Sequence, residues 1–154
     1  MVRRTLNEPR EFEDHADRST PAPTRRRLLA GAVGDGDADD TAALQAAMDS
    51  ASNGRIVALE NGKSDRITNT VVVDVAKVRG IEGNNARVVT DQDIVCLRIQ
   101  GTHTGSASPK HDPSERVKLP EMNPYVRGLR IHTVPALQGT GIQVEGTFGL
   151  TLAQ

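Results

Sequence analysis

From Gly54 onward, the apolar residues occur in short runs that are separated by Gly, Asn and Asp. Runs of this length, rich in Val and Ile, predict β-strands and argue against long helices. Short strands with glycine or asparagine at their corners fit the coils of a β-solenoid. We expect strands at 55–59, 67–73, 77–81, 87–89, 94–99, 126–131 and 141–144, and the beginning of another at 149–154.

A single helix is predicted immediately before these strands. Apolar residues recur there at the spacing of one helical face: Ala43, Leu44, Ala47, Met48 and Ala51. Asp39-Asp40-Thr41 supplies N-cap chemistry, and acids in the first turn suit the positive end of the helix dipole. The sequence Ser52-Asn53-Gly54 is a typical C-terminal stop. The expected helix is amphipathic and about 12 residues long.

The net charge and the distribution of apolar residues limit the kinds of partner that the chain is expected to bind. The chain carries a formal net charge of -1, with both signs spread along most of its length. We therefore expect no binding to nucleic acid or to an anionic membrane. No stretch approaches the roughly 20 apolar residues that a membrane span needs. The single cysteine, Cys96, lies in an apolar run and is expected to be a small buried hydrophobe.

Residues 1–27 differ in composition from the remainder of the chain. They hold seven arginines, five acids and three prolines, with little aliphatic periodicity. This composition predicts a charged tail that is flexible, or an anchor that orders on a partner. Residues 28–154 are expected to form the folded part, with an exposed inserted loop at about 101–124 that is rich in Thr, Ser, His, Pro and Lys.

Arg25-Arg26-Arg27 and the short apolar segment after it resemble the core of a twin-arginine export signal. The apolar segment ends at Gly34-Asp35, at or below the lower limit for such a signal, and no small-residue cleavage site follows before the acids begin. The sequence leaves open whether this segment is an export signal or a basic linker that runs directly into the fold.

Four carboxylates lie close together in the sequence: Asp35, Asp37, Asp39 and Asp40. Alternating acids of this kind can bind calcium, but an EF-hand loop would need a bidentate glutamate where this chain has Ala46. We therefore expect the acids to form turns and helix caps, and we predict no cofactor, with calcium as the alternative.

Three histidines and three arginines are further candidates for chemistry. The histidines, which lack the spacing of metal ligands, are expected to be solvated: His103, His111 and His132. The arginines lie in predicted strands, where outward positions face water: Arg79, Arg127 and Arg130. Because guanidinium groups form bidentate bonds with carboxylates, these arginines are candidate glycan contacts. The sequence assigns no catalytic residue.

Residues 30–47, AGAVGDGDADDTAALQAA, resemble the opening motif of the pectate-lyase-like superfamily, which reads roughly GAxGDGxxDDTxAIQxAI. The motif residues matched here are Gly34, Asp35, Gly36, Asp39, Asp40 and Thr41. As in that family, a glycine-introduced strand at 54–57 and the segment Val78-Arg79-Gly80-Ile81-Glu82-Gly83-Asn84 follow. The resemblance covers residues 30–100 well and the remainder loosely. One departure is that 59–65 lacks the proline and tyrosine of the family's turn.

The resemblance implies a mainly β fold, a right-handed parallel β-helix whose one helix caps its amino-terminal end. The family includes polysaccharide lyases, glycoside hydrolases and trimeric bacteriophage tailspikes that act on extracellular polysaccharide. We therefore expect a structural, carbohydrate-facing component of a phage tail, a tailspike or tail fibre located in the virion. It would be non-catalytic as it stands, homotrimeric, and attached to other virion proteins through residues 1–27. The alternative is a secreted polysaccharide lyase or glycoside hydrolase in a shortened form, since family members normally continue for several hundred residues.

Overall fold

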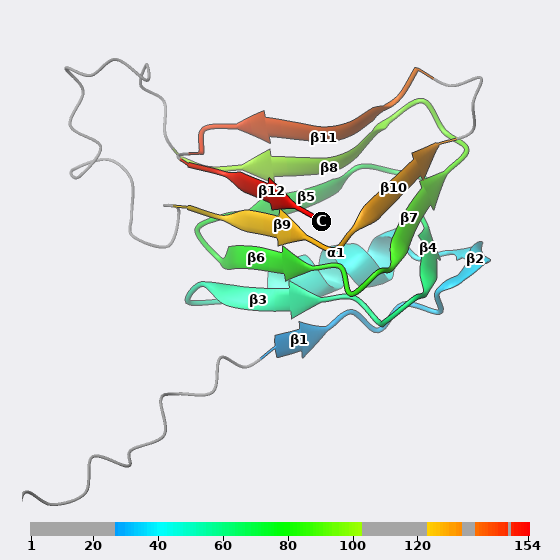
Figure 1. Cartoon of the computed structure of the whole chain (residues 1–154), viewed down its shortest axis with the longest axis horizontal. Coiled ribbons are helices and arrows are strands. Elements are labelled where there is room, and N and C mark those ends of the chain that lie inside the picture. Colours follow the sequence, from blue (N-terminus) through cyan, green and yellow to red (C-terminus); the bar gives the residue numbers. More distant parts are fainter. Residues whose placement is uncertain (1–26, 103–122, 134–137, 148) are drawn as a thin grey trace, which may run out of the picture.

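The computed structural model describes residues 27–102, 123–133, 138–147 and 149–154 (Figure 1). Within these ranges the chain is mainly β, with a single helix. The elements are β1 (Arg27–Leu29), β2 (Asp35–Asp39), α1 (Thr41–Ser50), β3 (Arg55–Ala58), β4 (Ser64–Arg66), β5 (Val71–Asp74), β6 (Val78–Glu82), β7 (Arg87–Thr90), β8 (Val95–Gln100), β9 (Tyr125–Arg127), β10 (Arg130–Thr133), β11 (Thr140–Glu145) and β12 (Thr151–Ala153).

The strands form three sheets, and every strand pairing in them is parallel. Sheet A has the order β1-β3-β6-β9-β12, sheet B the order β2-β4-β7-β10, and sheet C the order β5-β8-β11. The chain therefore passes through sheets A, B and C in the same order three times, and we call each such passage a coil. Figure 1 shows the coils stacked one above another. The prediction of a mainly β chain with parallel strands is confirmed.

Helix α1 occupies the place that a strand of sheet C takes in each complete coil. It follows β1 and β2, which belong to sheets A and B, and it packs against β5, the first strand of sheet C. Leu44, Ala47 and Met48 are its buried residues, and they join the core inside the coils. The predicted apolar face of the helix is confirmed at these three positions.

The core is built by inward-pointing side chains that stack from coil to coil. In sheet A, Val57, Ile81 and Val126 lie in register on successive strands, and each is at most 5% exposed. Burial of such a side chain contributes roughly 1.5–3 kcal/mol to folding. Cys96 is fully buried among these aliphatic residues, as expected, and its burial raises the pKa of its thiol. The core therefore needs no large aromatic ring.

Two predicted strands are wrong in their bounds. The run predicted at 67–73 begins too early, because residues 67–70 connect β4, which ends at Arg66, to β5, which begins at Val71. The run predicted at 126–131 is two strands, because Gly128 between β9 and β10 adopts a positive φ of 61° and turns the chain from sheet A to sheet B. Glycine adopts this conformation without a steric penalty. Corners of this kind end a strand even where apolar residues continue.

The helix start also differs from the prediction. Asp40 is the N-cap residue, but its side chain makes no capping bond, and no acid lies in the first turn. Asp39 instead accepts a hydrogen bond from the Thr41 backbone N–H at 3.0 Å. The helix ends at Ser50, before the predicted stop, because the C-cap residue Ala51 is already extended. Asn53 and Gly54, with positive φ of 54° and 68°, lie in the turn that leads into β3. Most of the predicted loop at 101–124, and all but the last residue of the predicted tail at 1–27, lie outside the described residues.

Candidate functional site

The motif that resembles the pectate-lyase-like opening forms a polar connection at the amino-terminal end of the coils. Asp40 is 2% exposed, and both of its carboxylate oxygens accept backbone hydrogen bonds. Oδ1 accepts from the Val33 N–H at 2.7 Å, and Oδ2 accepts from the Gly34 N–H at 3.0 Å. Gly34 has a φ of 68°, and a Cβ at this position would meet the side chain of Lys63. These residues hold the turn between β1 and β2 against the first coil.

Asp39 and Thr41 continue this connection onto the segment after β4. Asp39 Oδ1 accepts a hydrogen bond from the Thr41 hydroxyl at 2.5 Å, and Asp39 Oδ2 accepts one from the Thr68 hydroxyl at 2.7 Å. The Thr41 hydroxyl in turn accepts the Thr68 backbone N–H at 2.9 Å. Because these hydroxyls favour the ionised carboxylate, the pKa of Asp39 is lowered to about 2. The motif residues therefore act as structural parts of the fold.

The expected turn role of Asp35 agrees with its contacts. Asp35 Oδ1 accepts the backbone N–H groups of Asp37 and Ala38, both at 2.9 Å, and these bonds lower its pKa. Gly36, inside this turn, has a φ of 88°. Within the described part of the chain, no group of three His, Cys, Asp or Glu side chains is arranged to hold a metal ion.

A polar cluster on the outer face of sheet A is the best candidate for a functional site. Glu82 at the end of β6 is cross-strand neighbour to Arg127 on β9, and Gly80 is neighbour to Tyr125. The Tyr125 hydroxyl donates to Glu82 Oε1 at 2.9 Å, and Arg127 Nε donates to Glu82 Oε2 at 2.7 Å. The Arg127 guanidinium carbon lies 5.5 Å from the centre of the Tyr125 ring. We call Glu82, Tyr125 and Arg127 the sheet A cluster.

Burial differs among the members of the sheet A cluster. The Glu82 side chain is only 7% exposed, whereas that of Arg127 is 55% exposed. Tyr125 is half-buried, and its ring lies against Gly80, where an added Cβ would collide with it. Both Glu82 oxygens accept hydrogen bonds from the other two members. The cluster thus presents an oriented ring and an oriented guanidinium, with the buried carboxylate as their common anchor.

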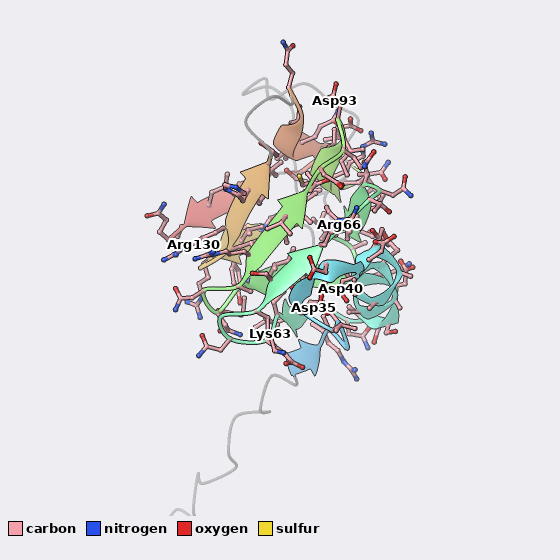
Figure 2. All side chains as sticks on the ribbon, turned by 90° about the vertical axis from the view of Figure 1, so that its right-hand side faces the viewer. Asp35, Asp40, Lys63, Arg66, Asp93 and Arg130 are labelled. Carbon is pink, nitrogen blue, oxygen red and sulfur yellow. The ribbon has the colours of Figure 1, made fainter. Side chains whose placement is uncertain are left out.

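The three arginines predicted as glycan contacts lie in two different sheets. Arg127 belongs to the sheet A cluster, and half-buried Arg79 lies on β6 where the β3–β6 register shifts. Arg130 is exposed on β10 of sheet B, where it is paired with Arg87. Figure 2 shows Arg130 at the left margin of the molecule, apart from Asp35 and Asp40. Arg79 and Arg127 therefore both lie in sheet A, whereas Arg130 lies in sheet B.

Two residues of the sheet A cluster, Glu82 and Tyr125, were not singled out from the sequence. The composition offered one indication for Tyr125, because it is the only tyrosine of the chain. Of the histidines, His132 is exposed on β10, which agrees with the predicted solvated side chain, whereas His103 and His111 lie outside the described residues.

One buried carboxyl lies apart from these groups. Asp65 occupies the inward position of β4 and is 2% exposed, within the apolar core. It makes no hydrogen bond or ion pair with another described residue. Burial, with the negative charges of Asp40 and Glu60, raises its pKa to about 6. The group therefore takes up a proton in a pH range where an ordinary aspartate is ionised.

Comparison with family models, curated proteins and solved structures finds no significant match to this chain. In the described part, no helix is long and apolar enough to cross a membrane.

Proposed function

We propose that the chain forms the amino-terminal coils of a right-handed parallel β-helix of the pectate-lyase-like type. Three parallel sheets that the chain visits in a fixed order support this assignment. A helix in the place of the first sheet C strand supports it as well, because the open end of a parallel solenoid needs a cap. Electron microscopy or diffraction that resolves the path of the chain would test the handedness of the coils. Left-handed coils would contradict the proposal.

As its function, we propose a structural, carbohydrate-facing component of a bacteriophage tail, in a tailspike or tail fibre. The observation that carries this proposal is the sheet A cluster, in which Tyr125 and Arg127 are held in fixed orientations on an outer face by Glu82. Aromatic faces and guanidinium groups are suited to contact the apolar and polar sides of a sugar. A ring and a charge fixed before binding also lower the entropic cost of association.

In this proposal the chain is a homotrimer in the virion, and residues 1–27 attach it to other virion proteins. Apolar side chains gather at the end of the coils opposite α1, where Val126, Ile131, Ile142 and Leu152 line a hollow. Contact between subunits at this hollow would remove apolar surface from water. Light scattering coupled to size exclusion, with and without residues 1–27, tests this part. A trimer in both forms is expected, and a monomer would contradict it.

Binding of oligosaccharides to the full chain tests the carbohydrate-facing function. Tyr125→Ala should weaken binding by about tenfold, the effect of losing an aromatic contact, whereas Tyr125→Phe keeps the ring and should lose less. Arg66→Gln, which removes a charge from sheet B, is the matched control and should leave binding of neutral saccharides unchanged. If no saccharide binds, or if both Tyr125 variants bind like the parent, the sheet A cluster is not a sugar contact. Release of reducing or unsaturated ends would instead favour a polysaccharide lyase or hydrolase.

A further inference from the structure

Three polar side chains form a column across neighbouring strands on the outer face of sheet B. Ser64 on β4 is paired in register with Arg87 on β7, and Arg87 is paired with Arg130 on β10. The next residue of each strand belongs to its more buried, inward side, so the three side chains point outward. Figure 2 views the molecule from the side on which sheet B lies in Figure 1, with Arg130 labelled there.

The column places two like charges directly opposite one another. Arg87 and Arg130 are both exposed, on strands about 4.8 Å apart. Like charges at paired positions of neighbouring strands destabilise the sheet. Two other described arginines lie beside carboxylates: Arg66 forms an ion pair with Asp91 at 2.9 Å, and Arg127 forms one with Glu82. Arg87 and Arg130 have no such partner among the described residues.

Within the described part of the chain, neither arginine of the column has a carboxylate partner. The Ser64 hydroxyl, next to Arg87, makes no hydrogen bond with another described residue. The nearest acid in the column is Asp35, which is paired with Ser64, and its Oδ1 accepts the backbone N–H groups of its own turn. The column therefore presents a hydroxyl and two guanidinium groups side by side, with Asp35 as its nearest acid at the Ser64 end.

We propose that Arg87 and Arg130, with Ser64, form a binding site for a phosphate dianion. A tetrahedral oxyanion offers several acceptor oxygens, and guanidinium groups bind phosphate oxygens through paired N–H donors. A dianion balances both arginines, whereas one carboxylate balances only one. The proposal goes beyond the carbohydrate-facing function, because this site lies on sheet B and does not involve the sheet A cluster. Inorganic phosphate and a phosphate ester of a saccharide share the chemistry that the site recognises.

Titration of the full chain with inorganic phosphate, followed by calorimetry and by phosphorus NMR, tests the site. Saturable binding to one site is expected. Arg87→Gln and Arg130→Gln should each weaken it by about tenfold, because each removes charge-assisted hydrogen bonds. Ser64→Ala should weaken it less. Lys77→Gln removes a positive charge of similar exposure from the turn between β5 and β6, and it should leave phosphate binding unchanged.

Parallel titrations with a monosaccharide phosphate and with an acidic disaccharide that carries only carboxylates identify the source of the anion. Tighter binding of the monosaccharide phosphate than of inorganic phosphate would assign the site to phosphorylated saccharides, and equal binding would assign it to phosphate itself. The proposal is overturned if the parent chain shows no saturable binding. It is also overturned if Lys77→Gln weakens binding as much as Arg130→Gln, or if the carboxylate disaccharide binds as well as phosphate.

Discussion

The side-chain amide of Gln45 and the backbone of Val72 exchange two hydrogen bonds. Gln45 Nε2 donates to the Val72 carbonyl oxygen at 3.1 Å, and the Val72 N–H donates to Gln45 Oε1 at 2.8 Å. The amide of α1 thereby takes the place of a neighbouring strand at the outer edge of β5. An uncovered edge of this kind can pair with another chain.

Replacement of Gln45 should therefore weaken the fold and uncover this edge. We expect Gln45→Leu to lower the free energy of unfolding by about 1–3 kcal/mol, because it leaves two backbone groups of Val72 without partners. Gln45→Glu keeps an acceptor for the Val72 N–H and should lower the free energy of unfolding less. Urea unfolding gives the free energies, and light scattering gives aggregation. Asp49→Ala removes only the other hydrogen bond of the Gln45 amide and is the control; an equal loss in that variant would contradict the edge role.

Replacement of the buried carboxylate of Asp40 should also lower the free energy of unfolding. Asp40→Asn places an amide donor against the N–H of Val33 or Gly34, so one buried backbone donor loses its acceptor. We expect a loss of about 2–3 kcal/mol in the free energy of unfolding. Hydrogen exchange at these two amides should rise well above that of the other strands. Asp37→Asn, at an exposed position of the same turn, should change neither quantity.

The strands that the sequence predicted well are those with Val and Ile on their inward sides. The runs at 55–59, 87–89, 94–99 and 141–144 correspond to β3, β7, β8 and β11. Strands β2 and β4 were missed, because their sequences, DGDAD and SDR, carry no apolar alternation. These strands are held by backbone pairing to their neighbours, and a pairing of that kind leaves no local hydrophobic pattern.

The sheet A cluster could not be predicted from local pattern for a related reason. Glu82 and Arg127 lie far apart in the sequence, on either side of the segment at 101–124, and they meet only through the register of β6 and β9. Register between parallel strands depends on the length of the whole intervening coil, which residue spacing alone does not specify. By contrast, the motif at 34–41 is contiguous, so its structural role could be expected from the sequence.

The contact between Gly80 and the Tyr125 ring makes a prediction about the sheet A cluster. Gly80→Ala introduces a Cβ that collides with the ring, so Tyr125 must move and its bond to Glu82 must lengthen or break. We expect a loss of about 1–3 kcal/mol in the free energy of unfolding. When Tyr125 is already replaced by alanine, Gly80→Ala should change the free energy of unfolding little. A double-mutant cycle measures this coupling, and additive effects would mean that the ring does not occupy this position.

The buried carboxyl of Asp65 should make the free energy of unfolding depend on pH. Its pKa is raised to about 6 from the ordinary value of 3.8, so the folded chain binds more protons than the unfolded chain between these values. The stabilising contribution of the protonated group is fully present below pH 3.8 and is lost as pH rises through about 6. Asp39, with its pKa lowered to about 2, behaves in the opposite way, since its contribution is present above 3.8 and is lost as pH falls towards 2.

Asp65→Asn should remove this pH dependence without a large change of shape. Relative to the parent, we expect the variant to gain about 2 kcal/mol in the free energy of unfolding between pH 4 and pH 8, because a tenfold difference in proton affinity between the folded and the unfolded chain corresponds to roughly 1.4 kcal/mol. Urea unfolding at pH 4, 6 and 8 measures the difference. The change with pH is the decisive quantity, because an uncharged amide in the core can itself carry a constant cost. Asp93→Asn, at an exposed acid labelled in Figure 2, is the control for the removal of a carboxyl group. If the free energy of unfolding of Asp65→Asn changed with pH as that of the parent does, the Asp65 carboxyl would have to be ionised in the folded chain at the same pH as in the unfolded chain.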